Sequence, residues 1–174
     1  MIPQEYLMWQ ARAQEIFMQK NADYGNSWEE LSLPSFTDLL YIKACRIRTL
    51  LLKDSVSPAT GESAIYDWIA LVNYATLAIR CLRKGYSSSL QEQIEKIWQE
   101  AENILERKNS DYGSAWQHIR PLAYIEFILM KIARIRSLDT APEKNAALIE
   151  DNLFDIINYA FLYLARYGST VPSS

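Results

Sequence analysis

Three polar residues near the C-terminus, Asp151, Asp155 and Asn158, have the spacing and chemistry of a metal-binding stripe. Their separations of four and three residues place them on one face of a helix that is otherwise mostly apolar. Carboxylates on a buried face are unfavourable unless they are paired with cations or bound to a metal. Oxygen ligands without His or Cys suit Mg²⁺ or Mn²⁺, so the stripe predicts a divalent-metal site. Ion pairs with Lys131 and Arg134 are the alternative.

Two pairs of basic residues, Lys43 with Arg46 and Lys131 with Arg134, have the spacing to hold a phosphate group. The members of each pair are three residues apart and share a helix face. An arginine binds phosphate oxygens through two N–H groups, and a lysine beside it adds a point charge. The pairs therefore predict phosphate binding, with salt bridges to neighbouring acidic residues as the alternative.

A third group of candidate residues lies in a turn that occurs twice, at 20–28 and 108–116. Each copy reads Lys-Asn-x-Asp-Tyr-Gly-x-x-Trp. A helix C-terminus explains the lysine, the asparagine and the glycine, but it needs neither an acid nor two aromatic side chains. The aromatic rings are fit to stack on a base, although packing in the core is their commoner role. The candidate binding residues are Lys20, Asp23, Tyr24, Trp28, Lys108, Asp111, Tyr112 and Trp116.

The two turns belong to a longer internal duplication with a constant offset of 88 residues. At this offset Lys43 and Arg46 match Lys131 and Arg134, and Asp67 matches Asp155. The repeat divides the 174 residues into units 1–86 and 87–174. A unit of this size buries too little surface to be stable alone, so we expect the two units to share one core.

Hydrophobic spacing predicts six helices that position these residues. Their expected ranges are 5–20, 35–53, 62–84, 90–108, 122–138 and 142–167. No segment alternates convincingly between polar and apolar residues, and there is no glycine-rich phosphate loop. We therefore expect an all-α fold, a six-helix bundle made of two tandem three-helix repeats related by a pseudo-two-fold axis.

Composition excludes several classes of function. The chain is 49% hydrophobic and 22% charged, with a net charge of −3, which argues against a nucleic-acid groove. Two cysteines and one histidine cannot form a four-ligand zinc site, and we expect Cys45 and Cys81 to be buried free thiols. No segment reads as a signal peptide or a membrane span, so we expect a cytoplasmic protein. Whether it forms a homo-oligomer stays open.

The motifs resemble those of the nucleotide modification associated domain family. Its hallmarks are the Lys-Asn-x-Asp-Tyr-Gly-x-x-Trp turn, then Lys-x-x-Arg-Ile, then an acid-rich helix that ends Asp-x-x-Asn-Tyr-Ala. The second unit matches at 108–116, 131–135 and 155–160. The first unit matches through Arg48, but its Asn73-Tyr74-Ala75 follows Asp67 by six residues instead of three.

The resemblance implies a role in nucleotide or modified-base metabolism. More distantly, the chain is similar to the all-α, MazG-like nucleoside triphosphate pyrophosphohydrolases, which hold Mg²⁺ with Glu-x-x-Glu on one helix and Glu-x-x-Asp on the next. In this chain the helix before the acid-rich one offers only Asp38 or Glu126, so the set of four carboxylates is incomplete.

Two hypotheses follow. In the first, the protein is a Mg²⁺-dependent nucleotide pyrophosphohydrolase, in which Mg²⁺ or Mn²⁺ activates a water and polarises the phosphate. The metal ligands would be Asp151 and Asp155 together with Glu150 or Glu126, and Asp67 is the equivalent aspartate in the first unit. In the second, a non-catalytic helical module binds a nucleotide, a modified nucleotide or a partner protein. A purely structural bundle explains the repeat but leaves the acidic and basic residues as salt bridges.

The remaining candidate residues have distinct roles under the first hypothesis. Catalytic acids or phosphate-stabilising groups would be Glu126, Glu150, Lys131 and Arg134. Substrate contacts would come from Lys43, Arg46 and Asn158, together with the eight turn residues. Because the second unit keeps the fuller polar stripe, a metal should prefer that unit.

Overall fold

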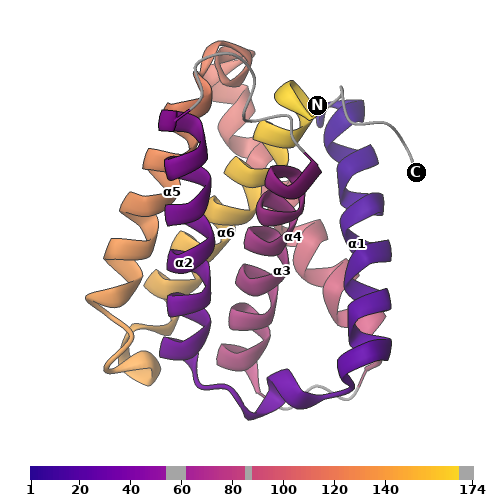
Figure 1. Cartoon of the computed structure of the whole chain (residues 1–174), viewed down its shortest axis with the longest axis vertical. Helices are drawn as coiled ribbons and strands as arrows, with labels where there is room; N and C mark the ends of the chain where they lie inside the picture. Colours follow the sequence, from indigo (N-terminus) through magenta and orange to yellow (C-terminus); the bar gives the residue numbers. More distant parts are fainter. Residues whose placement is uncertain (54–61, 85–87, 169–174) are drawn as a thin grey trace.

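The structure, a computed structural model, describes residues 1–53, 62–84 and 88–168, with only the backbone of Tyr24, Glu62 and Ser63. These residues contain helices and no β-strand, which confirms the all-α prediction. Figure 1 shows the arrangement of the six α-helices that the described residues form. They are α1 (Gln4–Tyr24), α2 (Leu33–Lys53), α3 (Glu62–Arg83), α4 (Leu90–Tyr112), α5 (Pro121–Arg136) and α6 (Pro142–Tyr167).

The two halves repeat the same order of elements. In each half a long helix is followed by a short 3₁₀ turn and then by two further helices. The 3₁₀ turns, η1 (Ser27–Glu30) and η3 (Ala115–His118), are 88 residues apart at both ends, the offset found in the sequence. The tandem repeat of three helices is thus present in the fold as well as in the motifs.

The repeated turn begins later than the sequence predicts. The expected end of the first helix at Lys20 is wrong, because α1 continues to Tyr24. The backbone N–H of Gly25 donates to the carbonyl of Asn21 at 2.8 Å, so Asn21 and Asp23 stay within the last helical turn. Gly25 then leaves the helix at φ 62° and ψ −139°, a conformation that essentially only glycine adopts. Gly113 ends α4 in the same way.

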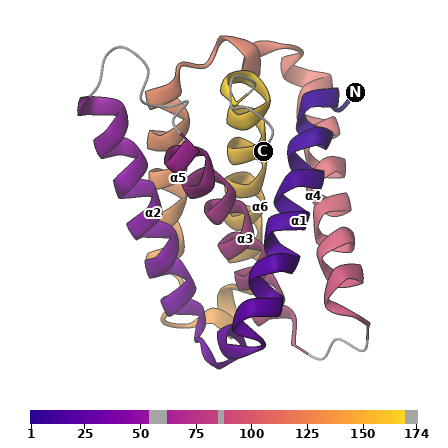
Figure 2. The ribbon, with the colours of Figure 1, turned by 45° about the vertical axis from the view of Figure 1, so that its right-hand side comes forward.

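The bundle has three layers of paired helices. Figures 1 and 2 show α2 and α5 on one side, α1 and α4 on the other, and α3 and α6 between them. Two pairs of helices related by the duplication pack on each other, α2 on α5 and α3 on α6, which agrees with a pseudo-two-fold relation between the repeats. Trp68 on α3 stacks on Tyr163 on α6, with ring centroids 3.6 Å apart and planes at 9°.

One hydrophobic core runs through all six helices of the described chain. It includes fully buried side chains from both repeats, such as Tyr6, Trp68, Trp98, Tyr124 and Tyr163. No helix in the described ranges is long and apolar enough to cross a membrane. Cys45 and Cys81 are free thiols that are half-buried, less covered than the sequence predicts.

Candidate functional site

The aspartate of the first repeat binds both members of its basic pair. Asp67 on α3 is buried, with 3% of its side chain exposed. Its Oδ2 accepts a hydrogen bond from Arg46 Nη1 at 2.6 Å, and its Oδ1 lies 3.4 Å from Lys43 Nζ. Lys43 and Arg46 reach it together because they are three residues apart on one face of α2. Two cations around one carboxylate leave a net charge of about +1 on this cluster.

The second repeat binds its aspartate through different partners. Asp155 on α6 lies 2.5 Å from Nζ of Lys108 and 3.0 Å from Nζ of Lys131. Lys108 comes from the repeated turn, whereas the member of the basic pair equivalent to Arg46 is Arg134, which is exposed. Arg134 makes no ion pair with any residue of the described part. The same four positions therefore form two different clusters in the two repeats.

The predicted metal ligands do not come together. Asp151 and Glu126 are exposed, and Glu150 faces Arg83 and not Asp155. Both oxygens of Asp155 already bind lysines. Among the residues that the structure describes, no three His, Cys, Asp or Glu side chains lie close enough to hold a metal ion. These residues do not fit a Mg²⁺ site, and we derive no chemical step through a metal.

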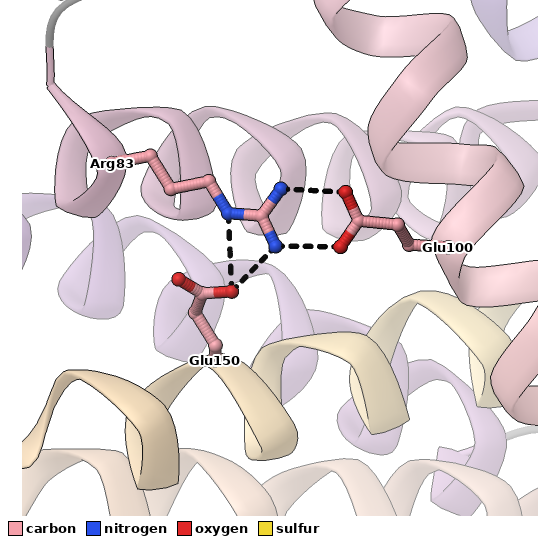
Figure 3. Close-up of polar contacts among 3 residues, drawn as sticks. All are labelled: Arg83, Glu100 and Glu150. Carbon is pink, nitrogen blue, oxygen red and sulfur yellow. Dashed lines mark hydrogen bonds and ion pairs between the residues drawn. The ribbon is translucent and has the colours of Figure 1, made fainter.

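Glu150 belongs to an ion cluster that joins the two repeats (Figure 3). Arg83 on α3 donates to both oxygens of Glu100 on α4, at 2.8 and 2.7 Å. The same guanidinium donates to Oε1 of Glu150 on α6, at 3.1 and 2.7 Å. The hydrogen bond from Arg83 lowers the pKa of the Glu100 carboxyl below its usual value of 4.5. This arrangement is a structural clamp among three helices.

Asn158 is also structural. Its side chain is buried, and the Tyr6 hydroxyl donates to its Oδ1 at 2.8 Å. Its Nδ2 donates to the carbonyl of Ala101 at 3.1 Å. The amide therefore ties α6 to α1 and α4, and both of its polar atoms are engaged.

Trp28 of the first turn is held in a defined orientation. Its Nε1–H donates to Asn21 Oδ1 at 3.1 Å, a bond that depends on α1 continuing past Lys20. Phe17 meets the ring edge-on at 6.5 Å, and the Arg80 guanidinium lies 4.8 Å from the ring centroid. The indole is half-buried, and its position is set from three directions.

A cavity of about 420 Å³ opens beside Trp28. Its walls come from α1, η1, α2 and α3, all in the first repeat. Lys20 and Trp28 were predicted as binding residues, and both line it. Other lining residues include Asn21, Leu39, Ala70, Asn73, Tyr74 and Leu77. Asn73 and Tyr74 could be noticed in the sequence only through their displaced place in the Asn-Tyr-Ala motif.

The cluster around Asp67 begins about one helical turn from the cavity along α2 and α3. Lys43 follows the lining residue Leu39 by four positions on α2, so it lies on the same face about one turn, or roughly 6 Å, further along. Asp67 precedes the lining residue Ala70 by three positions on α3. The first repeat thus brings an aromatic cavity and the cations Lys20, Lys43 and Arg46 into one region.

The other candidate residues of the turns, where the structure describes their side chains, do not line this cavity. Asp23 and Asp111 are exposed and make no ion pair with described residues, and Tyr112 is 72% exposed. Trp116 is half-buried, and its carbonyl accepts a hydrogen bond from the Tyr124 hydroxyl at 2.5 Å. The side chain of Tyr24 lies outside the described part of the chain.

The family model described as Nucleotide modification associated domain 1 matches residues 20–82 and 108–166, well over half of the chain. The chain belongs to the nucleotide modification associated domain 1 family. Each match begins at the lysine of the repeated turn, Lys20 or Lys108, and ends in the third helix of its repeat. The family unit therefore contains the turn, the basic helix and the acidic helix, and this chain carries it twice. Neither the curated proteins nor the solved structures yielded a match.

Proposed function

We propose that this member of the nucleotide modification associated domain 1 family is a nucleotide-binding protein that holds one nucleotide in its first repeat. The observation that carries the proposal is the position of the cavity. Trp28 and Lys20 line it, and the basic cluster of Lys43 and Arg46 begins one helical turn beyond its lining residue Leu39 on α2. An aromatic surface next to cations is the arrangement that suits a base attached to a phosphate.

The cavity has the size and lining for a base. Its volume of about 420 Å³ lies within the roughly 300–1,000 Å³ typical of small-molecule sites. Trp28 and Tyr74 supply flat aromatic surface, and stacking of a base on such a ring contributes about 1–3 kcal/mol. Leu39 and Ala70 close the remaining wall with apolar contacts.

The phosphates would bind the basic residues. Arg46 donates to Asp67 through Nη1, and half of its side chain is exposed. A guanidinium carries five N–H donors, so a phosphate oxygen can be bound while the ion pair with Asp67 stays in place. Lys20 is exposed and makes no ion pair within the described residues. Three cations and one buried aspartate therefore favour an anion of more than one negative charge.

The proposal does not include hydrolysis. Pyrophosphate release by a Mg²⁺-dependent route needs a group of carboxylates around the metal, and the described residues form none. The non-catalytic module is therefore the better supported of the two hypotheses.

The proposal is tested by calorimetric titration of the full chain with nucleoside triphosphates, monophosphates and nucleosides, with Mg²⁺ and with EDTA. We expect triphosphates to bind most tightly, with EDTA present as well as absent, and to raise the melting temperature through ligand linkage. Lys20→Gln should weaken triphosphate binding about fivefold, whereas Lys96→Gln, an exposed lysine on α4, should leave it unchanged. Release of pyrophosphate in Mg²⁺, or no binding of any nucleotide, would contradict the proposal.

A further inference from the structure

An unpartnered polar group lies in the wall of the first-repeat cavity. Asn73 on α3 is only 6% exposed, and its Oδ1 is buried without a hydrogen-bond partner among the described residues. Buried acceptors of this kind are rare in folded proteins, because their loss of contact with water is not compensated. Asn73 lines the cavity, so a rotation of its amide toward the cavity would let a ligand there supply the missing donor.

Asn73 is also a polar group in the middle of an apolar wall. Ala70, Asn73, Tyr74 and Leu77 follow each other on α3 at spacings of three, one and three residues, and all four line the cavity. This spacing defines one face of the helix. Asn73 therefore adds an amide to a face of the cavity that α3 otherwise forms with Ala70, Tyr74 and Leu77.

The second repeat has no equivalent amide. At the offset of 88, Asn73 corresponds to Phe161, which is fully buried, and Tyr74 corresponds to Leu162. The asparagine of the second Asn-Tyr-Ala motif is Asn158, whose amide is bound to Tyr6 and Ala101. The motif is displaced by three residues between the repeats, and its asparagine differs in role. Asn158 holds helices together in the second repeat, whereas Asn73 lines a cavity in the first.

We propose that Asn73 recognises the edge of the base, and that the ligand is a nucleotide whose base presents an N–H donor to Asn73 Oδ1. This inference rests on the proposed nucleotide site and adds its specificity. An amide offers both an acceptor and a donor, so it pairs with a base edge that carries a donor beside an acceptor, as the amino group and ring nitrogen of adenine and cytosine do. The residues that the structure describes form one such site, so we expect one nucleotide to bind per chain.

The test uses bases that differ only in the donor. ATP is compared with purine riboside triphosphate, and CTP with the triphosphate of pyrimidin-2-one riboside, because each analogue lacks only the amino group. Calorimetric titration of the full chain should give a stoichiometry of one, and loss of the amino group should weaken binding about tenfold in at least one of the two pairs. In Asn73→Leu the amino compound and its analogue should bind equally.

The outcomes separate the two proposals. Binding of triphosphates with no effect of the amino group in either pair, or an equal effect in Asn73→Leu, overturns the role of Asn73 and leaves nucleotide binding intact. No binding of any nucleotide to the wild-type chain overturns both. Asn73→Leu should fold, because it removes an unpartnered polar group from an apolar wall, and its melting temperature should equal or exceed that of the wild type.

Discussion

Single residues show how the two repeats have come to differ. Both keep a buried or half-buried aspartate on the third helix, but Asp67 binds two cations from α2, whereas Asp155 binds one lysine from α5 and one from the turn. In the second repeat Lys108 is therefore neutralised by a carboxylate 2.5 Å away. In the first repeat Lys20 lines the cavity instead. The two repeats thus differ in the role of the turn lysine, which lines a cavity in the first repeat and binds an aspartate in the second.

Replacing each aspartate by asparagine should affect stability unequally. We expect Asp67→Asn to destabilise the fold by about 2–3 kcal/mol, because Asp67 is 3% exposed and its loss leaves two cations without their carboxylate. Asp155→Asn should cost about 1 kcal/mol, because Asp155 is 15% exposed and Lys108 is half exposed. Urea unfolding of both variants measures the difference. Equal losses would show that burial does not set the strength of these pairs.

The sequence identified part of the candidate site by residue type. Lys20, Trp28, Lys43 and Arg46 were selected for their chemistry, and the fold places all four in or beside one cavity. Asn73 could not be selected, because its unpartnered state depends on what packs around it and not on its spacing. Periodicity specifies a helix face but not the neighbour that covers it.

For the acidic residues, the sequence predicted the shared helix face but not the partners that they meet in the fold. Asp151 and Asp155 do share a face, as their spacing predicts, yet one is exposed and the other is bound by two lysines. Glu150 is five residues before Asp155, so helix geometry places its side chain about 140° round α6 from that of Asp155. On that face of α6 it binds Arg83. The role of each carboxylate therefore depends on which residues of the neighbouring helices it meets.

At the scale of elements, the turn depends on one glycine in each repeat. Gly25 and Gly113 have φ of 62° and 58°, and a Cβ added at either would meet nothing within 4 Å. Substitution there changes backbone energy without causing a steric clash. We expect Gly25→Ala and Gly113→Ala each to destabilise the protein by about 1–3 kcal/mol.

Chemical denaturation of the two glycine variants checks this prediction, with Gln99→Ala on the exposed face of α4 as a control that should change stability by less than about 0.5 kcal/mol. A neutral effect of Gly25→Ala would mean that the turn readily adopts another conformation. If so, Trp28 would also lose its fixed orientation, and nucleotide binding should weaken in the same variant.

Most helix boundaries were predicted to within two residues, and the two larger differences have one cause. The start of α6 at Pro142 and its end at Tyr167 agree with the sequence, because proline and glycine mark them. The ends of α1 and α4 were predicted four residues too early, because Asn and Asp are weak helix formers. Here the Asn21 carbonyl receives the Gly25 N–H, and tertiary contacts of Trp28 favour the longer helix.

At the scale of the whole molecule, Arg83 connects the repeats. It is the last residue of α3, and it binds Glu100 and Glu150 from two helices of the second repeat. Arg83→Met should destabilise the protein by about 1–3 kcal/mol at pH 7, because it leaves two carboxylates near each other without a cation. Arg12→Met, which breaks an exposed pair with Glu15 within α1, should have almost no effect.

Arg83→Met should also change how the stability of the protein depends on pH. Arg83 lowers the pKa of Glu100 below 4.5 in the folded state, so this pair stabilises the fold fully above that pH and loses its effect as the pH falls through the lowered value. The difference in unfolding free energy between wild type and Arg83→Met should therefore shrink between pH 7 and pH values below about 4. A constant difference would show that Arg83 acts through packing alone.

The stacked pair at the centre of the bundle makes the halves complementary and not interchangeable. Trp68 faces Tyr163, and the positions equivalent to them by the offset of 88 are Ile156 and Ala75, both fully buried. In a dimer of identical subunits each position occurs twice, so a change at the axis alters both sides at once. In this fused chain Trp68 and Tyr163 each correspond to a smaller residue, Ile156 and Ala75, in the other repeat. Because the two copies are parts of one chain, each can change independently of the other, as the subunits of a heterodimer can.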